Sequence, residues 1–232
     1  MSYTKRKIID ECERTFTNKS TFYKEKIVNY RGKTSDTNEY YTEVVAEFLC
    51  NNIDEYIKGI KCITRKSSYK TIGHDGEYDS NSNREEEIIA MQIFNQSKKI
   101  GAFDFIGKIE DYQTPLKSTN EDDEVGKIDL LSCDGNIIRI LELKKPDSKE
   151  TMLRCVLEGF TYLKTAACKK LVENFGYDPE KVEVKACPFV FYGGAQHKEM
   201  MEDRPKLRNL MDLLDSKPYY IKKEDKYVVV ES

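Results

Sequence analysis

The sequence predicts a mixed α/β fold, in which a central mixed β-sheet is flanked by helices and preceded by a helical extension. Apolar residues recur at helical spacing in residues 39–57 and 84–96. Residues 126–145 contain two apolar runs separated by an Asp-Gly turn, and residues 182–194 form a further apolar run that ends in glycines. Because helical and strand patterns are interspersed along the second part of the chain, we expect helices to pack against the sheet.

The length of 232 residues fits one large domain or one domain with an appendage. We expect a helical extension and loop over residues 1–83 and the core domain over residues 84–232. Hydrophobic residues make up 39% and charged residues 34% of the chain, which is typical of a globular protein. The sequence contains neither a membrane-spanning apolar run nor the apolar stretch of a signal peptide, so we expect a cytoplasmic protein without a membrane partner.

Cysteine, histidine and charge content exclude several classes of site. The seven cysteines are scattered and form no C-x-x-C pair, which argues against a zinc site and a disulfide framework. Two histidines are too few for a histidine-rich metal site. The formal net charge of −3 provides no general attraction for nucleic acid, so any nucleic-acid contact has to depend on a local patch.

The remaining elements follow from periodicity and turn residues. We expect helix within residues 1–30, a long polar loop over 66–83, a strand over 102–109, an acidic loop over 117–124, a long helix over 148–175, a short helix over 204–216 and a final hairpin over 219–231.

The hairpin over residues 126–145 carries ionisable residues inside its apolar runs. Side chains alternate along a strand, so Glu142 and Lys144 share one face. A two-residue loop at Asp134-Gly135 or at Gly135-Asn136 keeps Asp129 on that same face, diagonal to Glu142 in the first case and directly opposite it in the second. A three-residue loop would break this arrangement. The apolar neighbours predict that these charges are buried.

Two close carboxylates in a sheet repel each other and are poorly solvated, so a cation should compensate them. Lys144 provides one positive charge against the two negative charges of Asp129 and Glu142. Oxygen ligands without a histidine or thiolate nearby favour Mg²⁺ or Mn²⁺ over zinc. A metal held by carboxylates beside a lysine is suited to activating water and stabilising charge on a phosphate.

These residues resemble the PD-(D/E)XK nuclease superfamily, whose motif is an Asp followed, at the end of the next strand, by Glu-x-Lys. Asp129 matches the Asp, with Ile128 in place of the preceding Pro, and Glu142-Leu143-Lys144 matches Glu-x-Lys. The resemblance covers roughly residues 84–192. It implies a restriction-endonuclease-like core.

Two helices extend the resemblance. The helix that precedes the motif often supplies another acidic residue in this superfamily, and Glu86 or Glu87 stands there, with Glu86 preferred because it shares a face with the apolar stripe. Some branches carry Gln-x-x-x-Tyr on the following helix. Glu158 and Tyr162 occupy these positions here, with Glu in place of Gln.

The resemblance implies a metal-dependent nuclease with DNA as the favoured substrate. Asp129 and Glu142 would bind Mg²⁺ or Mn²⁺, with the Leu143 carbonyl as a further ligand. Lys144 would orient or polarise the attacking water. Glu86 or Glu87 would complete the metal shell directly or through water.

Other interpretations of the same residues remain open. Asp129, Glu142 and Lys144 could form a cross-strand salt bridge on an exposed face, although their apolar neighbours argue against it. Acidic residues at 86 and 87 also suit a helix N-terminus without any catalytic role. For the pair at 158 and 162, a half-exposed helix face is favoured over site chemistry. At the level of the whole protein, the alternatives are a nuclease fold that binds nucleic acid or protein without cleavage, and a helical interaction protein whose N-terminal segment binds a partner. A homodimer is a further candidate assembly.

Overall fold

The structure, a computed structural model, describes residues 2–77, 84–118 and 126–230. The α-helices are α1 (Lys5–Thr15), α2 (Tyr41–Asn51), α3 (Ile53–Gly59), α4 (Glu85–Ile100), α5 (Met152–Thr165), α6 (Cys168–Asn174), α7 (Ala195–Met201) and α8 (Pro205–Leu213), with short 3₁₀ helices at Phe22–Lys24 and Lys26–Asn29. The strands are β1 (Lys108–Pro115), β2 (Lys127–Asp134), β3 (Ile137–Lys144), β4 (Glu183–Phe191), β5 (Tyr219–Lys223) and β6 (Tyr227–Val230).

The strands form one six-stranded mixed sheet in the order β1-β2-β3-β4-β5-β6. β1, β2 and β3 are antiparallel neighbours, β4 and β5 lie parallel to β3, and β6 returns antiparallel to β5. The parallel pairing of β3 with β4 requires a crossover, which α5 and α6 provide. The predicted mixed α/β class is therefore confirmed, and so are the strand within residues 182–194 and the final hairpin.

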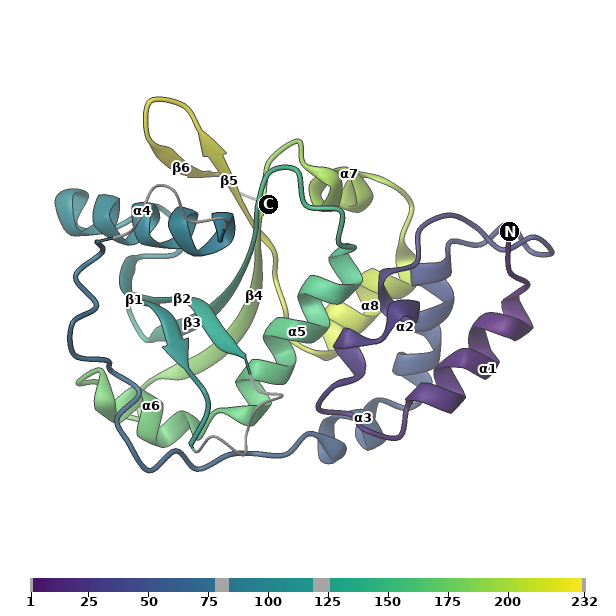
Figure 1. Cartoon of the computed structure of the whole chain (residues 1–232), viewed down its shortest axis with the longest axis horizontal. Helices are drawn as coiled ribbons and strands as arrows, with labels where there is room; N and C mark the ends of the chain where they lie inside the picture. Colours follow the sequence, from purple (N-terminus) through teal and green to yellow (C-terminus); the bar gives the residue numbers. More distant parts are fainter. Residues whose placement is uncertain (1, 78–83, 119–125, 231–232) are drawn as a thin grey trace.

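Helices cover both faces of the sheet (Figure 1). Buried apolar residues of α4 pack on one face against Leu130, Leu141 and Leu143. On the other face α5 packs against Ile138 and Ile140, and α1, α2 and α8 belong to the same apolar cluster as α5. Figure 1 shows α1, α2 and α3 gathered on the side of α5 that faces away from the sheet. The N-terminal segment therefore packs onto the layer formed by α5.

Terminal residues explain where α4 and α5 begin and end. α4 has three glutamates in its first turn and two lysines in its last turn, both of which favour the helix dipole, and it ends at Gly101 with φ +90°. α5 begins after Thr151, whose side chain accepts a hydrogen bond from the backbone N–H of Arg154.

The hairpin register selects one of the two predicted turns. Asp134 pairs with Ile137, so the loop is Gly135-Asn136, with Gly135 at φ +59°. The β2–β3 ladder runs to the Leu130–Leu141 pair and ends there. Continuing this register places Asp129 directly opposite Glu142, at the point where the two strands separate.

The strand predicted over residues 102–109 is wrong for most of its length, because β1 begins only at Lys108. Residues 103–107 form a tight turn in which Phe103 and Gly107 exchange backbone hydrogen bonds. Phe105 has φ +66° and Gly107 φ +76°, and a Cβ at Gly107 would lie 2.0 Å from the Cys133 carbonyl oxygen. The alternating phenylalanines thus mark a turn, in which Phe103 is buried and Phe105 is exposed.

Two predicted helices are divided. The helix expected over 148–175 consists of α5 and α6, separated at Ala166 and Ala167, and the helix expected over 39–57 consists of α2 and α3. α7 was not predicted as an element of its own. The predicted boundary between residues 83 and 84, and most of the acidic loop over 117–124, fall on residues outside the described ranges.

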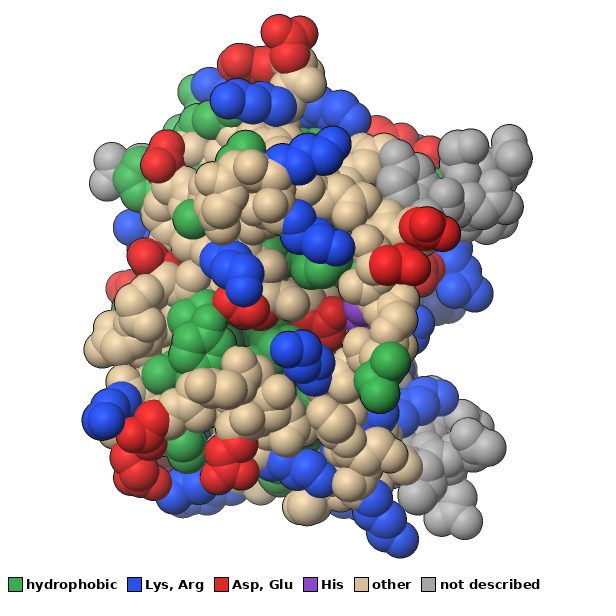
Figure 2. Space-filling model, turned by 90° about the vertical axis from the view of Figure 1, so that its left-hand side faces the viewer, with side chains coloured by type: hydrophobic (Ala, Val, Ile, Leu, Met, Phe, Trp, Pro, Cys, Tyr) green, Lys and Arg blue, Asp and Glu red, His purple; other side chains and the backbone are tan. Residues whose placement is uncertain are grey.

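All seven cysteines are free thiols in the structure. In the described part of the chain, no helix has the length and apolar character needed to cross a membrane. Figure 2 shows that basic side chains on one face of the molecule are dispersed among acidic and uncharged ones instead of forming one continuous patch.

Candidate active site

A cleft of about 620 Å³ lies where β2 and β3 separate. The first turn of α4, one residue each from β1 and β2, and the loop after β3 form its wall. The lining residues are Arg84, Glu85, Glu86, Glu87, Gln113, Asp129, Lys145, Asp147, Ser148, Lys149 and Glu150. The end of the opened hairpin thus meets the N-terminus of α4.

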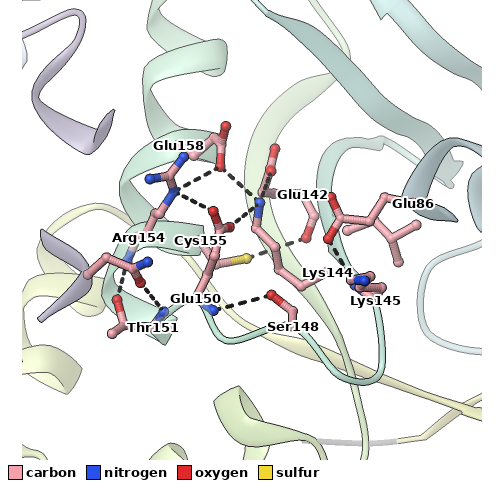
Figure 3. Close-up of polar contacts among 12 residues, drawn as sticks. Glu86, Glu142, Lys144, Lys145, Ser148, Glu150, Thr151, Arg154, Cys155 and Glu158 are labelled. Carbon is pink, nitrogen blue, oxygen red and sulfur yellow. Dashed lines mark hydrogen bonds and ion pairs between the residues drawn. The ribbon is translucent and has the colours of Figure 1, made fainter. Parts of the chain in front are cut away.

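Lys144 lies in a buried cluster of carboxylates next to this cleft (Figure 3). Its Nζ atom lies 2.8 Å from Glu142 Oε1, 2.9 Å from Glu158 Oε2 and 2.9 Å from Glu150 Oε2. The Lys144 and Glu142 side chains are only 5% and 3% exposed. The interpretation as a cross-strand salt bridge on an exposed face is therefore wrong, because the pair is sealed between β3 and α5.

Glu158 and Tyr162 belong to the same cluster. Both residues are buried, and the Tyr162 hydroxyl donates a hydrogen bond to Glu158 Oε1 at 3.1 Å. The half-exposed helix face favoured for this pair is wrong, because α5 turns these side chains toward the end of β3. Glu158 therefore contributes a second buried carboxylate to Lys144.

Asp129 is half-buried and held by groups from both neighbouring strands. Its Oδ2 atom accepts a hydrogen bond from the backbone N–H of Leu143 at 3.0 Å, and its Oδ1 atom accepts one from Gln113 Nε2 at 3.0 Å. The carboxylate therefore takes the place of a backbone acceptor where the β2–β3 ladder has ended.

The acidic residues of α4 reach the same place from the opposite side of the sheet. Glu86 Oε1 accepts a hydrogen bond from the backbone N–H of Lys145 at 3.0 Å, which ties the first turn of α4 to the residue after the Glu-x-Lys motif. Glu87 also lines the cleft, where its carboxylate lies 3.2 Å from Arg84 Nη1. Of the two candidates, Glu86 makes the contact with the end of β3.

Burial and charge shift the pKa values of these groups. Burial raises the pKa of Asp129 to about 7, against the opposing effect of Lys144. Burial and the charge of Glu158 raise the pKa of Glu142 well above its ordinary value. Burial alone would lower the pKa of Lys144, but Glu142 and Glu158 raise it well above 10.5. Lys144 therefore stays protonated at neutral pH and can act only as a cation and hydrogen-bond donor.

The expected metal-binding residues, Asp129, Glu142 and Leu143, offer only oxygen atoms as ligands. Glu142 Oε2 is buried and receives no hydrogen bond from a donor group among the described residues, so a buried acceptor is left open there. Among the residues described, no three His, Cys, Asp or Glu side chains form a group ready to hold a metal ion. The expected set, however, needs only two carboxylates and the Leu143 carbonyl, all oxygen donors, and these residues fit Mg²⁺ or Mn²⁺ in their chemistry.

The structure adds residues that the sequence did not indicate. Glu150 reaches Lys144 from the loop after β3, and its backbone carbonyl accepts hydrogen bonds from Gln196 Nε2 at 2.7 Å and Arg31 Nη2 at 3.0 Å. Gln113 reaches Asp129 from β1. No local pattern marks either residue, because each depends on a loop path or on the pairing of β1 with β2.

Comparisons with protein-family models, with characterised proteins and with solved structures found no match to this chain.

Proposed function

We propose that this protein is a metal-dependent nuclease that hydrolyses phosphodiester bonds of nucleic acid, with DNA as the favoured substrate. The observation that carries the proposal is the buried Oε2 atom of Glu142, which has no hydrogen-bond donor among the described residues, while Oε1 lies 2.8 Å from the cation of Lys144. A buried carboxylate oxygen without a donor is destabilising unless a cation or proton satisfies it.

The order of elements supports the proposal. A helix, a strand, a hairpin that carries the charged residues, two helices and a parallel strand follow one another from α4 to β4. This is the order expected for a restriction-endonuclease-like core, which we propose for this chain. The resemblance of Asp129 and Glu142-Leu143-Lys144 to the superfamily motif is the second support.

The proposed roles follow from the contacts of each residue. Asp129 and Glu142, with the Leu143 carbonyl, would hold Mg²⁺ or Mn²⁺, which when bound supplies positive charge for activating water and for stabilising the phosphate. Lys144 cannot take the proton of the attacking water because its ammonium stays charged. Its Nζ atom already lies within 2.9 Å of three carboxylates, so Lys144 would balance their charge and polarise the water through its positive charge. Glu86 fixes the end of β3 and presents a further carboxylate at the cleft.

A second candidate function is binding of nucleic acid or protein without cleavage. The charge of the cleft determines how this second function can be distinguished from cleavage. Acidic side chains outnumber basic ones among the lining residues, and the basic side chains in Figure 2 are dispersed. Without a bound cation such a cleft repels phosphate, so nucleic-acid binding that persists in the absence of divalent metal would favour this second function.

Cleavage assays on supercoiled plasmid, single-stranded DNA and RNA, each with Mg²⁺, Mn²⁺ or EDTA, test the proposal. We expect metal-dependent cleavage that falls at least about 10²-fold in Glu142→Gln and in Asp129→Asn. Glu180→Gln, which removes an exposed carboxylate paired with Lys169, is the matched control and should cleave like the unmodified protein. Equal cleavage by Glu142→Gln and the control would show that the activity comes from elsewhere.

A further inference from the structure

Gln113 has a left-handed backbone conformation within β1, with φ +48°. The pairs Tyr112–Leu130 and Thr114–Ile128 flank it, so it lies opposite Asp129 on β2. A left-handed conformation is strained for a residue other than glycine, and such residues concentrate at functional sites. Glycine would adopt this conformation at lower cost.

The side chain of Gln113 gives a reason for a residue other than glycine at this position. Its Nε2 atom donates a hydrogen bond to Asp129 Oδ1 at 3.0 Å, and the residue lines the cleft. The unusual backbone conformation and the contact with the candidate metal ligand thus occur in one residue.

The two oxygens of Asp129 are fixed from opposite directions. Oδ2 accepts from the Leu143 backbone N–H of β3, and Oδ1 accepts from Gln113 of β1. Both donors together fix the rotation of the carboxylate about its terminal bond. Because a carboxylate oxygen has two lone pairs, each oxygen keeps one free for a cation.

We propose that Gln113 is a positioning residue that holds the carboxylate of Asp129 in the orientation needed to bind the metal. The inference rests on the proposed function, since it assigns Gln113 to the same metal site. Residues that orient a metal ligand through hydrogen bonds commonly change metal affinity about 10–100-fold when they are replaced. The contribution of Gln113 is therefore to Mn²⁺ or Mg²⁺ affinity and not to the chemical step.

Titration calorimetry with Mn²⁺, together with thermal melting, tests the proposal on the full chain. Gln113→Met keeps the side-chain volume but removes the donor, and Gln113→Gly also relieves the backbone. We expect both variants to bind Mn²⁺ about 10–100-fold more weakly, while Gln113→Gly melts at a temperature no lower than the unmodified protein. At saturating Mn²⁺ the cleavage rate of Gln113→Met should return to within about threefold of the unmodified rate.

Asp215→Gly is the matched control. Asp215 also has φ +48°, and it follows α8, where its carboxylate pairs with Lys185. It should bind Mn²⁺ like the unmodified protein. Unchanged Mn²⁺ affinity in Gln113→Met, with or without a lower melting temperature, would overturn the role of Gln113 and leave the proposed function standing. If the unmodified protein and Glu142→Gln bind Mn²⁺ equally or not at all, the metal site itself is wrong, and the role of Gln113 fails with it.

Discussion

Two buried glutamates, Glu43 and Glu142, show how the same side chain can be used in different ways. Glu43 of α2 accepts hydrogen bonds from the backbone N–H groups of Lys206 and Leu207, both at 2.9 Å, so both of its oxygens are bound. Glu142 accepts from Lys144 through Oε1, whereas its Oε2 atom has no hydrogen-bond partner within residues 2–77, 84–118 and 126–230. A buried carboxylate with filled acceptors stabilises the fold, whereas one with an open acceptor is suited to bind something that the protein does not supply.

The cations near the two glutamates differ in the same way. Lys206 pairs with Glu47 at the surface, where the two side chains are 47% and 31% exposed. Lys144 is enclosed and surrounded by three carboxylates. A surface pair contributes little to stability because water screens it. A buried ammonium among carboxylates cannot be removed without leaving charge unbalanced.

The largest expected effect comes from Lys144→Met. Loss of the ammonium leaves Glu142, Glu150 and Glu158 facing one another, and breaking a buried ion pair from one side costs about 3–5 kcal/mol of unfolding free energy. Urea denaturation at pH 8 measures this. Lys206→Met is the control, and its effect should stay below about 1 kcal/mol. Equal effects of the two substitutions would contradict the distinction drawn between the buried and surface cations.

The hairpin over residues 126–145 shows how much of the candidate site the local sequence pattern can predict. The prediction that Asp129, Glu142 and Lys144 share a face follows from strand alternation and a two-residue loop, both local properties. The register of the structure selects one of the two predicted turns. Glu150 and Gln113 escaped prediction for a physical reason. The contact of Glu150 with Lys144 depends on the path of the loop after β3. The contact of Gln113 with Asp129 depends on the left-handed backbone conformation of Gln113, which no sequence propensity favours.

The burial of Glu158 could not be predicted for a related reason. A glutamate and a tyrosine four residues apart fit an exposed helix face equally well, and only the packing of α5 against β3 decides between the two. The prediction of a strand over 102–109 is wrong because two phenylalanines two residues apart, Phe103 and Phe105, occur in a tight turn as well as in a strand. Where one local pattern fits two structures, tertiary contacts thus determine which of the two forms.

The next effect is the pH dependence contributed by Asp129. Its folded-state pKa of about 7 lies above the ordinary 3.8, so the folded protein binds more protons than the unfolded chain between these values. The stability must therefore fall as pH rises from about 4 to 7. A shift of this size corresponds to at most about 4 kcal/mol, and to less here because Asp129 is only half-buried.

Unfolding free energies of the unmodified protein and of Asp129→Asn, measured in EDTA from pH 4 to pH 8, isolate this contribution. The variant should gain stability relative to the unmodified protein as pH rises and hold that gain above pH 7. A constant difference across the range would show that Asp129 titrates as an ordinary carboxyl group.

Replacing each buried glutamate by glutamine compares the two directly. Glu43→Gln should lower the unfolding free energy by about 1–3 kcal/mol, because one backbone N–H at the start of α8 loses its acceptor. Glu142→Gln should change it by less than about 1 kcal/mol, since the substitution removes one carboxylate from an excess around Lys144. The effects on cleavage should be reversed, with loss only in Glu142→Gln. Chemical denaturation and cleavage assays on the same preparations measure both.

The smallest expected effect tests how closely Glu142 is held. A Cβ at Gly159 of α5 would lie 3.3 Å from the Cβ of Glu142, a tight contact with the side chain that carries the open oxygen. In Gly159→Ala the gain of about 1 kcal/mol in helix propensity opposes this contact, so stability should change little. Mn²⁺ affinity should nevertheless fall several-fold, because small displacements of a ligand matter more to a metal than to the fold.

Gly59→Ala in α3 is the control for helix propensity. The added Cβ there would lie 2.7 Å from Cγ and 3.0 Å from Cβ of Lys19, so this side chain would have to shift, at a position that does not line the cleft. Gly59→Ala should leave Mn²⁺ affinity unchanged. If Gly159→Ala also leaves Mn²⁺ affinity unchanged, displacement of Glu142 does not affect metal binding. The open oxygen of Glu142 would then be an unsatisfied buried polar atom like the others in the described core, and not part of a metal site.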